Sequence, residues 1–414
     1  MTAILALCLV IVSPAAGPKG MTSSEKAKAK KIVARYFKER DDAKRAAILK
    51  ELEPLDHPTF QDLKGLRKAY FKLARRGLPR VRGKNPHTCL HPDYPGTYTM
   101  RVPSRARSGT KTGVFISLHG GGEGVGDGAQ IERIFGLPDS KLICVYPTVV
   151  RKVTAAWNKA EGERYVVSIL DELKRTYKID TNRVYLAGHS MGGYGTWSIG
   201  GKHADLFAAA SAMAGGTFER GIVPHYRNLP LWVYNAEDDN RVRPDSSKRA
   251  MKRIDEELRP RYGGYETVFH LYPRKDRIGH GFPKKSGHDV KSIFSWMLKR
   301  KRNPRPDRVV FEPTLRWKRR MYWVGADARS RGILEVRRAK NTFTVGAASG
   351  ALSLYLDAKL CDLKKAVVVV KEDADGGKTE VFNAIPTPGL RVFVASIGTY
   401  NDPELASVAR IRVE

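Results

Sequence analysis

The chain has few cysteines, and the apolar run at its start is too short to cross a membrane. Its 4 cysteines are scattered over 414 residues, at positions 8, 89, 144 and 361. This spacing builds no disulfide framework. The apolar residues 4–12 fall well short of the roughly 20 that a membrane-spanning helix needs. We therefore expect neither a disulfide-stapled fold nor a transmembrane protein.

Acidic residues are scarce relative to basic ones. The chain has 74 Lys and Arg against 43 Asp and Glu, a formal net charge of +31. Such an excess is typical of a solvated basic surface, and it also favours anionic surroundings such as an acidic polysaccharide, a cell-surface polymer or a membrane surface. No nucleic-acid recognition motif accompanies the charge, so we expect no specific nucleic-acid partner.

The first 20 residues have the layout of a signal peptide. The apolar residues 4–12 are followed by the small residues of 13–17, although no Lys or Arg precedes the apolar run. A short apolar segment followed by small residues is typical of an export leader. We predict a signal peptide over 1–20 and a secreted or periplasmic mature protein. The alternative is that translation begins at Met21, which leaves no leader.

The remaining sequence divides into three regions with different patterns. Residues 21–85 are predicted to be helical, because Thr22 and Glu25 have capping-box spacing and apolar residues recur at helical spacing. Residues 86–303 alternate short apolar runs with amphipathic stretches, which predicts a doubly wound, mainly parallel α/β domain. Residues 304–414 favour a β-sandwich, with strands expected at 309–311, 321–324, 333–336, 342–345, 352–356, 366–370 and 391–395.

The strongest local signal is the pentapeptide Gly188-His-Ser190-Met-Gly192, which follows the apolar run 184–187. A serine at the tip of a tight strand-to-helix turn has a strained backbone, and only small neighbours at the two glycine positions allow that turn. The turn exposes the hydroxyl and aims the helix N-terminus at a reacting carbonyl. The pattern predicts that Ser190 is a nucleophile; the alternative is a plain glycine-rich turn.

A second glycine-rich segment, His119-Gly120-Gly121-Gly122, follows the apolar run 114–118. Glycines let backbone N–H groups approach a developing oxyanion that a side chain would block. We expect one oxyanion donor at Met191 and the other at Gly120 or Gly121. The alternative is a dinucleotide-binding loop, because residues 124–129 fit a relaxed G-x-G-x-x-A, a weak match when taken alone.

A serine nucleophile needs a base, and the base needs an orienting acid. The acid is expected in the loop after the apolar run 231–234, where Asp239 is preferred over Asp238 and Glu237. The base is expected at His280, between two glycines. His288 is the alternative, whereas His189 inside the pentapeptide is expected to pack beneath the turn.

These motifs together resemble the α/β-hydrolase superfamily. Residues 180–197 are especially similar to the catalytic domains of prolyl-oligopeptidase-like hydrolases and to secreted polyhydroxybutyrate depolymerases and feruloyl esterases, and the resemblance covers about residues 90–303. It implies an α/β-hydrolase sheet, a triad of Ser190, Asp239 and His280, and an oxyanion hole near Gly120, Gly121 and Met191. One departure is Asn235-Ala236, where relatives commonly have His-Gly before the acid loop.

The expected reaction is hydrolysis of carboxylic esters, small or polymeric, through an acyl-enzyme, with no metal or organic cofactor. A prolyl-oligopeptidase-like peptidase is the alternative, although the 85 residues before the catalytic region are too few for a propeller of about 40 residues per blade. A second alternative is a non-catalytic binding protein that presents aromatics such as Trp317, Tyr322 and Trp323. The spacing of His87, Cys89 and His91 also admits a metal, but no fourth ligand stands nearby.

Overall fold

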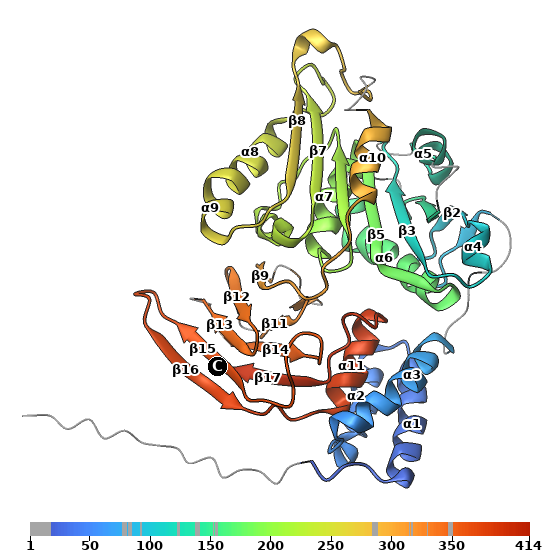
Figure 1. Cartoon of the computed structure of the whole chain (residues 1–414). Helices are drawn as coiled ribbons and strands as arrows, with labels where there is room; N and C mark the ends of the chain where they lie inside the picture. Colours follow the sequence, from blue (N-terminus) through green and yellow to red (C-terminus); the bar gives the residue numbers. More distant parts are fainter. Residues whose placement is uncertain are drawn as a thin grey trace, which may run out of the picture.

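The computed structural model describes residues 18–76, 81, 85–91, 93–121, 125–136, 141–151, 153, 156–283, 289–313, 315, 318–328, 330–346 and 351–414. Most of the expected signal peptide, residues 1–17, lies outside these ranges. Figure 1 shows the N-terminal helices and the C-terminal sheets together at one end of the molecule, with the large central sheet at the other. No helix in the described part of the chain is both long and apolar enough to cross a membrane.

The N-terminal region is helical, as predicted. Thr22 caps α1 (Ser23–Lys38) and forms the expected capping box with Glu25. Helices α2 (Asp42–Lys50) and α3 (Phe60–Arg76) follow, with a short 3-10 turn between them at Glu53–Leu55. The apolar residues of α1 at helical spacing are buried in one cluster with those of α3 and of α11 (Leu390–Tyr400), so the N-terminal helices share their core with a C-terminal helix.

A mainly parallel sheet forms the middle of the chain. Among the described residues it has eight strands in the order β1-β2-β4-β3-β5-β6-β7-β8. The pairs from β4 through β8 are parallel, whereas β1–β2 and β2–β4 are antiparallel. The strands are β1 (His87–Thr88), β2 (Thr97–Arg101), β3 (Thr112–Leu118), β4 (Ile143–Pro147), β5 (Ile179–His189), β6 (Ala209–Met213), β7 (Leu231–Ala236) and β8 (Thr267–Tyr272).

Helices cover both faces of this sheet. Alternate residues of β3 and β5 pack into two different clusters, one with α6 (Ala160–Thr176), α7 (Met191–Lys202) and α8 (Asp245–Arg253), the other with α5 (Gly128–Phe135) and α10 (Val290–Leu298). Because both faces are buried, the strands read as continuous apolar runs. The predicted doubly wound α/β architecture is confirmed. The shorter helical segments are α4 (Ser104–Arg107), α9 (Arg259–Tyr262), a π-helical segment at Ile254–Leu258, and 3-10 turns at Ala156–Asn158, Arg220–Asn228 and Arg274–Asp276.

Two smaller sheets form the C-terminal region and fit the predicted sandwich. Their strand orders are β10-β11-β14-β17 and β16-β15-β13-β12-β9, antiparallel except for the β13–β15 pair. The strands are β9 (Arg308–Phe311), β10 (Arg320–Met321), β11 (Val324–Ala326), β12 (Leu334–Ala339), β13 (Thr342–Val345), β14 (Leu352–Leu356), β15 (Val367–Glu372), β16 (Lys378–Ala384) and β17 (Ala409–Val413).

Two of the strands expected here are wrong in detail. Residues 391–395 lie in helix α11 (Leu390–Tyr400), because Leu390, Phe393 and Ile397 recur at helical spacing and bury against α1 and α3. The expected strand 321–324 is two short strands, β10 and β11, joined by a tight turn in which Tyr322 has a φ of 53°. Tertiary packing in the first case and a hairpin turn in the second decided the conformation of β-branched and aromatic runs.

Buried polar contacts join the α/β part of the chain to the C-terminal part. Arg302 and Asp402 form an ion pair at 2.8 Å with both side chains fully buried. Thr181, near the start of β5, donates a hydrogen bond to the same Asp402 at 2.8 Å. Lys174 of α6 donates to the carbonyl of Tyr400 at the end of α11. These contacts hold α6 and the amino end of β5 against α11.

Candidate active site

The strand-to-helix turn after β5 places Ser190 at the carboxyl edge of the sheet. β5 ends at His189 and α7 begins at Met191, so Ser190 is the residue between them, with φ 58° and ψ −120°. A Cβ at Gly188 would lie 2.3 Å from the carbonyl oxygen of Gly192, and one at Gly192 would lie 2.1 Å from that of Leu118. Neither position has room for a side chain, so the two glycines permit the strained conformation of Ser190.

Ser190, His280 and Asp239 lie in one hydrogen-bonded series. The Nε2 of His280 lies 2.8 Å from the Ser190 Oγ, and its Nδ1 lies 2.8 Å from the Asp239 Oδ2. With the ring proton on Nδ1, the serine hydroxyl donates to Nε2 and the imidazole donates to the carboxylate. The Asp239 side chain is fully buried, and its Oδ1 accepts the backbone N–H groups of Arg241 and Val242, each at 2.9 Å.

The loop that carries His280 is held on both sides of the imidazole. The Gly279 N–H donates to the Asp238 Oδ1 at 3.0 Å, and the Tyr234 hydroxyl donates to the Gly281 carbonyl at 3.1 Å. Gly279 has a φ of 56°, which a glycine tolerates. Sequence reasoning considered Asp238 only as an alternative acid and gave Tyr234 no role. Both contacts depend on a loop conformation that no local pattern in the sequence encodes.

The other residues considered for acid and base roles lie elsewhere. The His189 ring packs beside the rings of His280 and Phe282, at centroid distances of 5.0 and 4.3 Å. Burial, and then the neighbouring His280, lower the pKa of His189 to about 4. Glu237 lies 3.9 Å from Lys248, and both side chains are exposed to solvent. His288 lies outside the described residues.

Of the predicted oxyanion residues, Met191 and Gly120 lie next to Ser190. Met191 is the first residue of α7, so its N–H has no acceptor within the helix. A Cβ at Gly120 would lie 3.1 Å from the Ser190 Cβ, which places this backbone directly against the serine. Gly121 has a φ of 107° and folds toward Val125, whose carbonyl oxygen would lie 2.4 Å from an added Cβ. Gly122 lies outside the described residues.

The backbone of this glycine loop is fixed from below by His119. The fully buried imidazole accepts the N–H of Val149 at 3.1 Å, and the His119 carbonyl accepts the indole N–H of Trp157 at 3.0 Å. Gly126, in the segment considered as a dinucleotide loop, packs so closely that its Cβ would lie 2.1 Å from the Gly120 carbonyl oxygen. The segment therefore supports the glycine loop; Gly124 lies outside the described residues.

An aromatic pair lies near the turn. Tyr194, on the first turn of α7, stacks on Phe218 at a centroid distance of 6.1 Å and an interplanar angle of 14°. Phe218 is 73% exposed, a value that leaves one face of its ring open. The ring of Phe218 therefore presents apolar area to solvent close to the first turn of α7.

The described residues contain no cluster of three or more His, Cys, Asp and Glu side chains that could hold a metal. The Cys89 thiol, considered above as a ligand, instead lies 3.3 Å from the Glu172 carboxylate, and burial raises its pKa. Cys144 and Cys361 are buried free thiols.

The fold is that of the α/β-hydrolases, with a serine at the turn after β5. Consistent with the resemblance read from the sequence, residues 155–218 match the prolyl oligopeptidase family. The chain is 36% identical over 77 residues to the bifunctional acetylxylan esterase/xylanase of Neocallimastix patriciarum, covering 18% of this chain and 11% of that protein. It is 27% identical over 166 residues to an uncharacterized secreted protein of Arthroderma benhamiae, covering 37% and 18% respectively.

The chain thus spans less than a fifth of the length of either curated relative. Among solved structures, a thermostable esterase is 26% identical with a TM-score of 0.41, covering 50% of this chain and 59% of that one. A ferulic acid esterase from Anaeromyces mucronatus is 15% identical with a TM-score of 0.37, covering 53% and 87%.

Proposed function

We propose that the chain is a serine hydrolase that cleaves carboxylic esters through an acyl-enzyme. The observation that carries this proposal is the series Ser190–His280–Asp239, with both hydrogen bonds at 2.8 Å. His280 takes the proton of the Ser190 hydroxyl as the oxygen attacks the ester carbonyl. Asp239 holds the imidazole in the tautomer whose Nε2 accepts that proton and stabilises the imidazolium that forms.

The tetrahedral intermediate needs donors for its oxyanion. The N–H of Met191 at the start of α7 and a backbone N–H of the Gly120–Gly121 loop supply them. These donors are held in place before the reaction by the His119 contacts and by the strand-to-helix turn at Ser190. Loss of one such donor typically lowers turnover about 100- to 1000-fold. His280 then protonates the leaving alcohol, and a water activated by the same imidazole releases the acyl group.

An ester is the preferred substrate, small or polymeric, with an acyl or feruloyl group on a polysaccharide as the favoured class. Support comes from the names of the relatives, one of which is a bifunctional acetylxylan esterase/xylanase, and from the open ring of Phe218 beside the turn. Export from the cell fits both the leader pattern and the relative named as secreted. The family match over 155–218 keeps a peptidase as the second candidate.

The test uses purified protein, a Ser190→Ala variant and a matched Ser108→Ala variant, whose serine is exposed far from the turn in sequence. Each is treated with a fluorophosphonate probe, a p-nitrophenyl ester series and amino-acid p-nitroanilides. We expect labelling and ester turnover in the parent protein and in Ser108→Ala, and neither in Ser190→Ala.

Three other outcomes contradict the proposal in different ways. Turnover of anilides above esters favours the peptidase. Labelling that persists in Ser190→Ala places the nucleophile elsewhere. A folded protein that is neither labelled nor active favours a binding protein on a hydrolase scaffold.

A further inference from the structure

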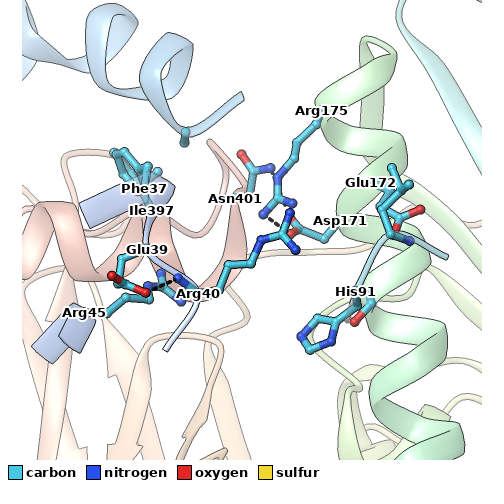
Figure 2. Close-up of a pocket in the computed structure, with 14 residues that line it drawn as sticks. Phe37, Glu39, Arg40, Arg45, His91, Asp171, Glu172, Arg175, Ile397 and Asn401 are labelled. Carbon is cyan, nitrogen blue, oxygen red and sulfur yellow. Dashed lines mark hydrogen bonds and ion pairs between the residues drawn. The ribbon is translucent and has the colours of Figure 1, made fainter. Parts of the chain in front are cut away.

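A cavity of about 160 Å³ lies where the N-terminal helices, α6 and α11 meet. Arg40 and Arg45 reach it from the α1–α2 loop and α2, Asp171 and Arg175 from α6, and Asn401 from the end of α11 (Figure 2). It continues into a cleft of about 640 Å³ between α6 and the C-terminal sheets, with which it shares lining residues. None of these residues has a part in the proposed ester hydrolysis.

The arginines of this cavity are unevenly paired with its carboxylates. Arg175 forms an ion pair with Asp171, and Figure 2 shows Arg40 pointing toward the same place. The Arg40 guanidinium makes no ion pair with any residue in the described ranges. Among the residues that the structure describes, Arg45 pairs only with the exposed Asp42, at 4.0 Å, and its guanidinium lies 4.7 Å from the centre of the Tyr36 ring.

The remaining acids of the lining are directed elsewhere. Glu39 accepts the backbone N–H groups of Arg40 and Asp41, at 2.8 and 3.0 Å. Glu172 is buried and accepts from the Leu90 N–H and the Tyr98 hydroxyl, and burial raises its pKa. Glu172 acts on Arg175, which already pairs with Asp171. In the described ranges neither Glu39 nor Glu172 forms an ion pair with Arg40 or Arg45.

The titration of His91 on the cavity wall reports the same excess of positive charge. Its pKa lies below the ordinary value, chiefly because burial disfavours the imidazolium. Asp93 favours the imidazolium, whereas Arg40, Arg164 and Arg175 each repel its charge and lower the pKa further. Three guanidinium groups thus act on the His91 imidazole.

Three of the residues that line this cavity also have buried polar atoms without a partner among the described residues. Asn401 is 7% exposed; its Nδ2 donates to Asp171 at 3.0 Å, while its Oδ1 accepts no hydrogen bond. The Nε atoms of Arg45 and Arg175 are buried and donate to no acceptor. Buried polar atoms normally have partners, so the wall offers donors for anionic oxygens and an acceptor for a hydroxyl.

We propose that this cavity binds an anionic, hydroxylated sugar unit of an acidic polysaccharide. Its carboxylate or sulfate lies between Arg40, Arg45 and Arg175, where guanidinium groups suit such planar or polyoxygen anions, and a hydroxyl donates to the Asn401 Oδ1. The adjoining cleft, lined by Tyr36, Tyr355, Tyr400 and further arginines, receives the neighbouring units of the polymer.

This site is remote from the proposed nucleophile. It lies against the carboxyl end of α6, which leads into the amino end of β5, whereas Ser190 follows the other end of this 11-residue strand. At about 3.3 Å per residue the strand alone spans roughly 30 Å. Polymer binding here therefore retains the protein on its substrate without contacting the reacting ester.

The experiment measures binding of acidic oligosaccharides to the full chain by calorimetry at constant ionic strength. The probes are an oligogalacturonate, a sulfated galactan oligosaccharide and a neutral xylo-oligosaccharide of similar length. The variants are Arg40→Gln, whose side chain is exposed, and Arg175→Gln, with Lys44→Gln as the control because it is an exposed charge on α2 outside the cavity. The melting temperature of each variant checks its folding.

We expect an acidic probe to bind at least about tenfold more tightly than the neutral one. Arg40→Gln and Arg175→Gln should weaken that binding by a similar factor, with Lys44→Gln within about twofold and turnover of a small ester unchanged in all three. The probe that binds distinguishes a carboxylate from a sulfate ligand. Equal weakening in Lys44→Gln would show attraction by overall charge only, and equal binding of all probes would show no anion site; either result overturns the proposal.

Discussion

At the scale of single residues, the two neighbouring carboxylates after β7, Asp238 and Asp239, make different contacts. Asp239 contacts the imidazole itself, whereas the neighbouring Asp238 accepts a backbone N–H of the loop that carries it. Both side chains come from one short turn. The sequence alone favoured Asp239 over Asp238 as the orienting acid but did not predict that Asp238 contacts the His280 loop. Substitution of each carboxylate tests this difference.

Asp239→Asn should lower kcat for esters by about 10⁴-fold, because an amide in this position favours the wrong imidazole tautomer. Asp238→Asn retains an oxygen that accepts the Gly279 N–H, so its kcat should stay within about threefold of the parent value. Steady-state kinetics on a p-nitrophenyl ester measures both. The reverse ranking would make Asp238 the orienting acid.

The elements of the fold differ in how far local sequence determines them. The turn at Ser190 was predictable because only glycine fits at the two flanking positions. The buried strands were predictable because their residues are continuously apolar. Helix α11 was not predictable, because the β-branched residues at 392 and 394 are typical of a strand and the helix depends on the burial of Phe393 and Ile397 against the N-terminal helices. The glycine loop after β3 was likewise predictable in position, but its support by Gly126 and His119 arises only from tertiary contacts.

The helical assignment of residues 390–400 predicts where stability resides. Phe393 is fully buried and stacks with Tyr70 of α3 at a centroid distance of 6.0 Å. Phe393→Ala should therefore lower the free energy of unfolding by about 3–5 kcal/mol. Thr399→Ala, on the exposed face of the same helix, should change it by less than about 0.5 kcal/mol. Urea denaturation followed by circular dichroism measures both, and similar losses in the two variants would contradict this packing.

At the scale of the whole molecule, His225 joins the α/β part of the chain to the C-terminal part. Its Nδ1 lies 3.0 Å from the Gly201 carbonyl of α7, and its Nε2 accepts the Glu312 N–H at 2.9 Å. Burial lowers its pKa to about 4. Between pH 6.5 and about 4 the unfolded chain therefore binds a proton that the folded chain does not.

The sign of this effect gives a pH prediction. Stability from His225 should be complete above about pH 6.5 and decline as the pH falls toward 4, by roughly 2 kcal/mol between pH 7 and 4.5. Urea unfolding of the parent protein and of His225→Gln at both pH values tests this. The variant should be less stable at pH 7 but lose less on acidification. Parallel losses in the two proteins would show that carboxylates alone cause the acid sensitivity.

The core that α11 shares with α1 and α3 has a consequence for folding during synthesis. During synthesis the helices α1, α2 and α3 emerge well before residues 390–397, which complete their packing. Until then the nascent chain presents unsealed apolar surface near its amino terminus, the kind of surface that chaperones recognise. Because residues 390–397 must be present before this surface is covered, the three helices stay accessible to chaperones while the intervening residues are being made.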